Sequence, residues 1–243
     1  MKCIVFDLSG KTAHFKKPDV NSYCYYSYNH ITKIHLMGLL GAVIGLGGYN
    51  QQGENMYPEF YEELHKLKVA IIPNSKNRGL FNKKIQTFNN SVGYASKEEG
   101  NNLVVREQWI EDVEWKIIIN LESDIKENIK EKLKNYLLEY KAEYIPYLGK
   151  NDHPADIQNV EIFDAQEISD PENIDSLFYL DKIKLESDAV IFETPFLFKD
   201  YMPVSLNEEK MYEFKKIAYT NRLVKNNEDC KLYKHGSYNF TFI

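Results

Sequence analysis

One stretch near the start of the chain gathers side chains that could hold phosphates and stack on a base. After a short apolar run at 3–8, a loop carries cations, amide and hydroxyl donors and one aromatic ring, contributed by Lys11, His14, Phe15, Lys16, Lys17, Asn21 and Ser22. Single-stranded nucleic acid is bound by phosphate donors and by flat surfaces on which its bases stack. On composition alone, an ordinary solvated loop explains these residues more simply.

Four tyrosines follow this loop at nearly alternate positions, at 23, 25, 26 and 28. Tyrosines with this spacing more often cover one face of a strand than stack on bases. We therefore retain only Tyr23 as a candidate contact.

Three later groups of residues could also contact a nucleic acid. A basic block supplies Arg78, Lys83 and Lys84, the run after 103 supplies Arg106, Gln108 and Trp109, and a polar turn supplies Lys150, Asn151 and His153. Core packing explains Trp109 about as well. Turn formation explains the last group equally.

The segment GLGGYN at 45–50 does not fit a dinucleotide-binding loop. It lacks the last glycine of that motif, and it follows the helix predicted at 31–46 instead of preceding a helix. A glycine that ends the helix is the better interpretation. The backbone amides of Gly47 and Gly48 could still meet a phosphate.

The six histidines show no metal-ligand spacing, so no metal and no cofactor are predicted. His30 and His35 lie about 140° apart around a helix and cannot share a ligand face. A metal-independent ribonuclease could draw its acid and base from His14, Lys16 and Tyr23. Nothing in the sequence matches these as a pair, so no catalytic residue is predicted.

Charge is divided unevenly along the chain. The net charge is −6, but residues 1–50 carry +3 and residues 66–97 carry +7, while 51–65 carry −4 and 98–243 carry −12. Contact with phosphate depends on the local field and not on the total. The basic blocks therefore remain candidates, and the acidic remainder is solvated surface or a face that meets protein partners.

The apolar pattern predicts an α+β fold. Strands are expected at 3–8, 68–73, 103–107, 113–121, 144–148 and 156–163, and helices at 31–46, 58–67 and 123–140, the last with Ser123 as its N-cap. In chain order this is β-α-β-β-α-β, the ferredoxin-like or RRM-like arrangement. Gly38, Gly41 and Gly45 share one face of the first helix, where we expect another backbone to approach closely.

Two domains are predicted. Residues 1–166 form the ferredoxin-like domain, interrupted at about 74–102 by a basic hairpin with few core contacts, and residues 167–243 form a small β-rich C-terminal extension. The three cysteines have no ligand spacing, no secretory leader is read at the start, and the longest apolar run, at 36–49, is too short to span a bilayer. We expect a cytoplasmic protein without membrane contact.

Four stretches carry a resemblance to a known family: FDLSGKTAHFKKPDVNS at 6–22, HITKIHLMGLLGAVIGLGGY at 30–49, LVVREQWIEDVEWKIII at 103–119 and YIPYLGKNDHPADI at 144–157. They resemble the fifth CRISPR-associated (Cas) protein family, in the form found in type I-B Cascade complexes. The resemblance covers roughly the first two thirds of the chain. It implies a RAMP-superfamily protein with a thumb-like hairpin at the basic insertion, which binds the 5′ handle of the crRNA and caps one end of the Cascade backbone.

The resemblance favours a non-catalytic RNA-binding role for the candidate residues. The implied partners are the crRNA handle, the Cascade backbone subunit and the Cascade large subunit, with target DNA contacted indirectly. The alternative is a metal-independent endoribonuclease that processes CRISPR repeat RNA, as type I-C relatives do. A free-standing RRM-like regulator is a third possibility, which the glycine-rich helix and the acidic extension disfavour.

Overall fold

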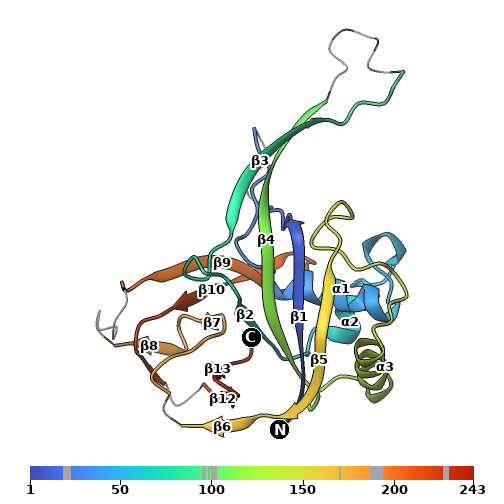
Figure 1. Ribbon diagram of the computed structural model, residues 1–243. Helices are drawn as coiled ribbons and strands as arrows, with labels where there is room; N and C mark the ends of the chain where they lie inside the picture. The colour runs from blue at the N-terminus through green and yellow to red at the C-terminus, as the bar shows by residue number, and fades with distance from the viewer. Residues whose placement is uncertain are drawn as a thin grey trace.

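The protein is built on a five-stranded antiparallel sheet (Figure 1). The computed structural model describes residues 1–18, 23–94, 97, 99, 103–169, 171–186, 194–226 and 230–243. The strands of this sheet are β1 (Lys2–Ala13), β2 (Val69–Pro73), β3 (Asn82–Asn89), β4 (Val104–Asn120) and β5 (Asp156–Asp164). Their order is β2-β4-β1-β5, and β3 pairs with the N-terminal half of β4. The predicted α+β class is confirmed.

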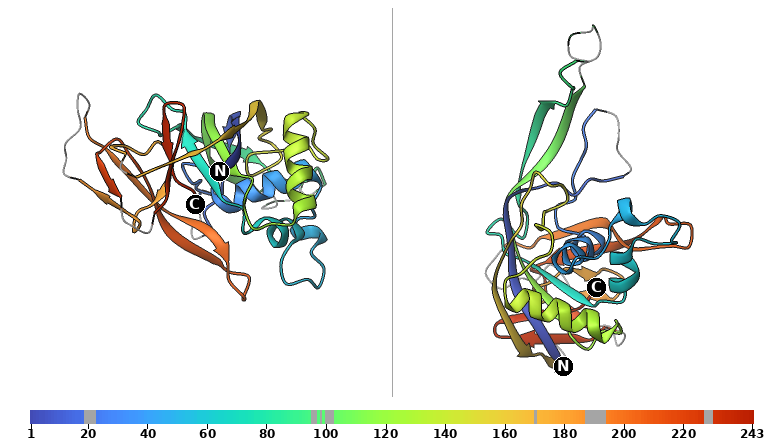
Figure 2. Two further views of the ribbon diagram at one scale, coloured as in Figure 1. Left: turned by 90° about the horizontal axis from the view of Figure 1, so that it is seen from below. Right: turned by 90° about the vertical axis from the view of Figure 1, so that its right-hand side faces the viewer.

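One face of the sheet is apolar because side chains alternate along its strands. Ile4, Phe6 and Leu8 of β1 are fully buried. Their cross-strand partners on β4 include the buried Ile117 and Trp115. The helices α1 (Lys33–Ile44), α2 (Glu59–Leu64) and α3 (Glu127–Leu138) lie together on this side, as Figure 2 shows, and a short 3-10 helix, η1 (Tyr49–Gln51), follows α1.

The glycine face of α1 packs against α2. A Cβ on Gly41 would lie 2.6 Å from the Cβ of Phe60, whereas a Cβ on Gly38 would lie 3.8 Å from the Phe60 ring. The close approach expected at these glycines is therefore made to the next helix, chiefly to one side chain. Gly45 has a φ of 77° and donates its N–H to carbonyls of the last turn, so the prediction that a glycine ends the helix is confirmed.

The C-terminal part of the chain is rich in short strands, as expected. They are β6 (Gln166–Ile168), β7 (Phe178–Tyr179), β8 (Ile183–Leu185), β9 (Leu197–Leu206), β10 (Tyr212–Thr220), β11 (Val224–Asn226), β12 (Leu232–His235) and β13 (Tyr238–Phe240). Tyr233 and Phe240 cover Val5 and Ile118 on the face of the main sheet that the helices leave open. Met202 and Ile217 join the core under the helices. A boundary near 166 stays a prediction.

An arm projects from the sheet at the end opposite the N-terminus (Figure 1). We use this name for β3 and residues 104–111 of β4, which pair from Asn82 opposite Glu111 to Asn89 opposite Val104. A projecting hairpin was expected at 74–102, but its second strand is the start of β4. The strands predicted at 103–107 and 113–121 are therefore one continuous strand. Asp112, with a φ of 47°, marks the passage from sheet to arm.

Two further local predictions are wrong. Residues 144–148 form no strand and make only an isolated bridge, between Tyr147 and Pro154. Ser123 does not cap α3, because its hydroxyl donates to the carbonyl of Asn120 at 2.6 Å and accepts the N–H of Lys68 at 3.1 Å. It secures the loop between β4 and α3 instead. No helix in the described part of the chain is long and apolar enough to cross a membrane.

Candidate nucleic-acid interface

The base of the arm is where the predicted loop meets β4. The N–H of Tyr25 donates to the carbonyl of Arg106, and the N–H of Gln108 donates to the carbonyl of Tyr25, both at 2.9 Å. The segment around Tyr25 thus runs along the edge of β4 that β3 does not occupy. The loop and the basic block, separated by some sixty residues in the sequence, are brought together here by backbone hydrogen bonds.

One face of the arm combines aromatic and basic side chains. Lys84 on β3 lies opposite Trp109 on β4, and Phe88 follows on the same face four residues along β3. Lys150 reaches this face from the turn before β5, and its Nζ lies 5.7 Å from the centroid of the Phe88 ring. We call this surface, formed by Lys84, Phe88, Glu107, Trp109 and Lys150, the Trp109 face.

Glu107 holds the Trp109 face together from beneath. Lys150 Nζ donates to its Oε1 at 2.7 Å, and the indole N–H of Trp109 donates to its Oε2 at 3.0 Å. Burial alone would raise the pKa of Glu107, but these two hydrogen bonds outweigh burial and lower it. The charge of Lys150 is therefore largely balanced, and the net positive charge of this face comes from Lys84.

Lys16 supplies a second cation on the other side of the loop. Its Nζ lies 3.9 Å from the centroid of the Tyr25 ring, within the range of a cation–π contact. Across the described residues, neither Lys16 nor Lys84 has a carboxylate within ion-pair distance. Tyr23 lies on the same loop and is 86% exposed to solvent. These groups are accessible to a phosphate or a base.

Three predicted contact residues lie inside the protein. His14 and His153 are at most 1% exposed, and Phe15 packs against Trp115 in the core. His14 Nδ1 lies 3.1 Å from the carbonyl of Gln108, and the ring of His153 packs edge-on against Trp109. Burial lowers the pKa of both histidines. These side chains support the surface and do not reach a ligand in solution.

The opposite face of the arm carries Lys83, Arg106 and Gln108. It adjoins β9, where Lys17 Nζ donates to both carboxylate oxygens of Asp200 at 2.9 Å. Burial, and then the nearby Lys17, lower the pKa of Lys83. Because alternate residues of a strand face opposite sides, Arg106 and Gln108 do not share a surface with Trp109, although all three come from one candidate group.

The glycine amides after α1 already have partners. Gly47 N–H donates to Oε2 of Glu59 at 2.7 Å, and Gly48 N–H donates to Oε1 of Gln51 at 3.0 Å. A carboxylate thus occupies the position at which Gly47 was expected to meet a phosphate. These glycines follow α1 and do not join the residues at the base of the arm.

The remaining predicted residues are scattered. Lys11 is exposed, 3.8 Å from a carboxylate at the start of the arm. Arg78 has a φ of 53° and lies in the exposed turn before β3. Asn151 is exposed in the turn that carries Lys150. Asn21 and Ser22 lie outside the described residues.

Several members of the interface were missed from the sequence. Phe88 and Glu107 could have been found by continuing the two-residue period of the strands through the basic block. Tyr25 and Asp200 had no such signal, because their roles depend on a loop lying against β4 and on a C-terminal strand lying beside it.

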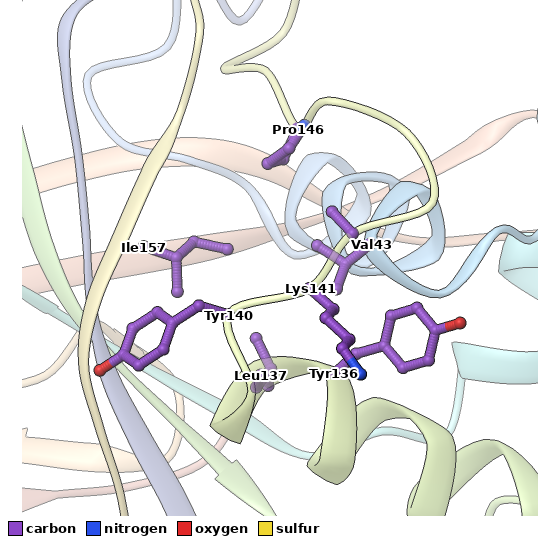
Figure 3. Close-up of a pocket in the computed structure, with 8 residues that line it drawn as sticks. Val43, Tyr136, Leu137, Tyr140, Lys141, Pro146 and Ile157 are labelled. Atoms are coloured by element: carbon purple, nitrogen blue, oxygen red, sulfur yellow. The ribbon is translucent and has the colours of Figure 1, made fainter.

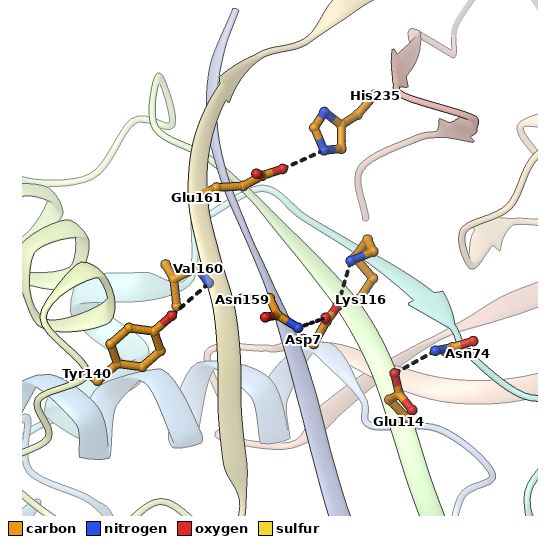
Figure 4. A network of polar contacts seen from close by, with 9 residues as sticks. All are labelled: Asp7, Asn74, Glu114, Lys116, Tyr140, Asn159, Val160, Glu161 and His235. Atoms are coloured by element: carbon orange, nitrogen blue, oxygen red, sulfur yellow. Dashed lines mark hydrogen bonds and ion pairs between the residues drawn. The ribbon is translucent and has the colours of Figure 1, made fainter.

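The exposed part of the sheet face opposite the helices is unsuitable for RNA. Asp7 accepts hydrogen bonds from Lys116 at 2.6 Å and from Asn159 at 2.8 Å, and Glu161 lies beside His235 (Figure 4). The network holds three carboxylates, of Asp7, Glu114 and Glu161, against one lysine, and this acidic balance would repel phosphates. In the described ranges no group of three metal-ligating side chains occurs either. The base of the arm is the better candidate site.

Comparison with known proteins gives a likeness of fold. The sequence matches no protein-family model, and no curated protein is significantly similar to it. A crystal structure of a CRISPR protein from Archaeoglobus fulgidus aligns with 100% of this chain and 98% of its own length, with a TM-score of 0.54 at 14% identity. A chain of a CRISPR RNA-guided surveillance complex aligns over 91% of each chain, with a TM-score of 0.55 at 12% identity. The chain therefore shares the fold of these CRISPR proteins.

Proposed function

We propose that this chain is a non-catalytic subunit of a type I, I-B-like CRISPR Cascade surveillance complex that binds and caps the 5′ handle of the crRNA. The observation that carries the proposal is the base of the arm, where Lys16, Tyr23, Lys84 and Trp109 present cations and aromatic rings on adjoining surfaces. Single-stranded RNA is held by such a combination. The likeness of fold to a chain of a CRISPR RNA-guided surveillance complex supports it.

We also infer that the core is ferredoxin-like and that the chain belongs with the fifth Cas family. The sheet order β2-β4-β1-β5 supports this inference, as do α1 between β1 and β2 and α3 between β4 and β5. In this proposal the arm corresponds to the thumb-like hairpin and contacts the neighbouring backbone subunit. The large subunit contacts the body, and target DNA is met indirectly.

The burial of His14 supports a role without catalysis. A general acid or base must reach the proton that it transfers. His14 is 1% exposed, and burial lowers its pKa, so it is a poor proton donor at neutral pH. Lys16 and Tyr23 remain accessible, but neither has a partner in the described residues that would activate it.

The test measures binding and cleavage in one experiment. Purified protein is titrated into labelled handle oligonucleotide and labelled repeat RNA over a series of salt concentrations, in buffer with EDTA. We expect salt-dependent binding without new cleavage products. The K16A/K84A variant should bind more weakly, with a salt slope smaller by about 0.7 for each phosphate that the variant no longer neutralises.

A matched control is available at the other end of the sheet. Lys66 and Lys68 belong to the basic stretch at 66–97 but lie at the end of the sheet opposite the arm. There Asn120 N–H donates to the carbonyl of Lys68. K66A/K68A removes the same charge and should bind as the unaltered protein does. Equal weakening by both double variants would refute the arm-base site. Cleavage of repeat RNA in EDTA would replace the proposal with the endoribonuclease alternative.

A further inference from the structure

A strip of basic and aromatic side chains crosses one face of the hairpin formed by β9 and β10, which lies below the arm in Figure 1. Tyr201 pairs with Lys216 across the hairpin, and Lys199 and Phe214 each lie two residues away on the same face of their strands. All four are exposed, Tyr201 by 57%. Ile217, at the alternate position, is buried in the core, so the four residues share the face turned away from that core. We call them the Tyr201 strip.

The positive charge of the Tyr201 strip is not cancelled by neighbouring acids. Among the described residues, neither Lys199 nor Lys216 has a carboxylate within ion-pair distance, and Lys216 Nζ lies 5.3 Å from the ring centroid of its cross-strand partner. The acids next along the strands, Asp200 and Glu213, occupy alternate positions and face the other side. The strip is therefore basic, although residues 167–243 carry 14 acidic against 10 basic side chains.

Two contacts fix the hairpin against the base of the arm, in addition to the ion pair between the loop and β9. The ring of Phe198 on β9 packs edge-on against buried His30, with 5.1 Å between the ring centroids, and His30 accepts the indole N–H of Trp115 on β4 at 3.3 Å. The turn before β3 lies so close to β10 that a Cβ on Gly79 would be 2.1 Å from the ring of Tyr219. The strip is thus held in place before any ligand binds, so binding requires little ordering of the protein.

Further cations lie between the arm base and this strip. Lys16 lies at the edge of β4 that β3 leaves open. On the face of the arm that adjoins β9, Arg106 and Lys83 are exposed, and neither forms an ion pair with another described residue. Lys83 lies near enough to Asp200 for the charge of this acid to counter the effect of burial on the lysine pKa. Asp200 is followed along β9 by the strip, which begins at Lys199, so a single strand that crosses the edge of β4 meets cations along its way.

The hollow on the helix side of the molecule offers no comparable surface. The pocket between α1 and α3 has a volume of about 160 Å³ and is lined mainly by apolar side chains such as Val43, Leu137 and Ile157 (Figure 3). Its one charged lining residue, Lys141, is already paired with Glu139 at 2.6 Å. This pocket therefore has no free cation for a phosphate.

We propose that the RNA held at the arm base continues over the edge of β4 and across the Tyr201 strip, so that the C-terminal extension carries a second RNA contact. Lys199 and Lys216 neutralise phosphates, and Tyr201 and Phe214 offer rings on which unpaired bases stack. The inference rests on the proposed function, because the strand reaches the strip from the arm base.

Two single-stranded RNAs test the inference, one of about 6 nucleotides and one of about 14 that contains the same sequence, both within the range that single-strand-binding folds cover. Each is titrated with the full chain over a series of salt concentrations. The short RNA should respond to K16A/K84A only. With the long RNA, K199A/K216A should reduce the salt slope by about 0.7 for each of two phosphates. Y201T should weaken binding of the long RNA about fivefold or more, through the loss of one stacked base.

A matched control removes two lysines from the same extension. K231A/K234A alters β12 and the residue before it, at the end of the molecule opposite the arm, and should leave the affinity for the long RNA unchanged (Figure 1). Thermal unfolding of Y201T should be little changed, because threonine keeps the preference for a β-strand. A photoreactive 4-thiouridine at either end of the long RNA should cross-link to the peptide that contains Tyr201.

The outcomes separate the inference from the proposed function. If binding of the long RNA depends on Lys16 and Lys84 but not on the strip, and no cross-link reaches β9 or β10, the inference is overturned and the proposed function stands. If neither RNA binds, both are refuted. If the strip variants lose affinity for a glutamate-rich peptide or for duplex DNA but keep their affinity for the long RNA, the strip is a surface for protein or DNA, and the inference is overturned as well.

Discussion

Lys150 and Glu107 form an ion pair of 2.7 Å in which the glutamate side chain is only 5% exposed. The pair joins the turn before β5 to the arm, two segments that have no strand pairing with each other. Because Glu107 also accepts the indole N–H of Trp109, the same carboxylate sets the position of a cation and of an aromatic ring. The surface of the arm base thus depends on one buried acid.

Replacing Lys150 with methionine should destabilise the protein. The change leaves Glu107 buried without its charged donor, which costs about 1–3 kcal/mol, toward the lower value because Lys150 is partly exposed. Urea denaturation measures the decrease in stability. The K150M/E107Q double variant removes the uncompensated charge and should recover part of the stability. A double variant less stable than K150M would contradict this account of the pair.

Gly38 and Gly41 should respond in opposite ways to alanine. G38A gains helix propensity of about 1 kcal/mol, and its new Cβ makes only an ordinary contact with Phe60. G41A places a Cβ 2.6 Å from that of Phe60, and overpacking of this kind costs about 1–3 kcal/mol. Thermal unfolding of both variants checks the pair. Equal melting temperatures of the two variants would contradict this prediction and show that α2 moves aside to accommodate the new Cβ of G41A.

Stability should fall as the pH decreases below about 6.5, the usual pKa of histidine. Burial lowers the pKa of His30 to about 3 and that of His35 to about 4. In this range the two histidines bind protons in the unfolded chain but not in the folded protein, so a lower pH favours unfolding. Each of these histidines should cost about 1.4 kcal/mol for every pH unit between 6.5 and its folded pKa, and no more below that value.

Urea denaturation at pH 7.5 and pH 5.5 tests this dependence. The H30Q and H35Q variants should each show a smaller difference between the two pH values than the unaltered protein. H65Q is the control, because His65 lies on the surface at the end of α2. If neither the H30Q nor the H35Q substitution changes the pH dependence, other groups must cause it.

The neighbours Lys16 and Lys17 should have separate roles. Lys16 lies over Tyr25 on the surface, so K16A should weaken RNA binding with little effect on stability. Lys17 bonds both oxygens of Asp200, so K17A should cost about 1–3 kcal/mol of stability and affect RNA less. RNA titration measures the affinity of both variants, and urea denaturation measures their stability. A reversed pattern would show that Lys17, and not Lys16, contacts the RNA.

The sequence predicted the elements of the main sheet better than the site. Short continuous apolar runs located β1 and β2, and the glycine helix was confirmed with its end at Gly45. The two strands predicted between 103 and 121 proved to be one, because the polar residues between them lie where the strand leaves the core. Ser123 failed as a cap because a hydroxyl can also bond to a nearby loop.

The site was harder to predict because it depends on contacts between distant segments. Phe15 and His14 had suitable chemistry, but a sequence cannot show that their side chains turn inward. Trp109 and Arg106 were named in one candidate group, yet strand alternation places their side chains on opposite faces of the arm. Tyr25 was set aside as a strand residue, whereas its backbone does pair with β4 while its ring meets Lys16.

The continuity of β4 has a mechanical consequence. Its 17 residues run from the core into the arm without a break, a length of about 55 Å at the usual rise per residue. The arm is therefore a direct extension of a central strand of the sheet, and no hinge loop separates the arm from the sheet. Removing two residues from each of β3 and β4 would shorten its reach by about 7 Å and keep every side chain on its own face. Removing one residue from each strand would move the side chains beyond the deletion to the opposite face of the arm. The length of the arm can therefore change only in steps of two residues per strand.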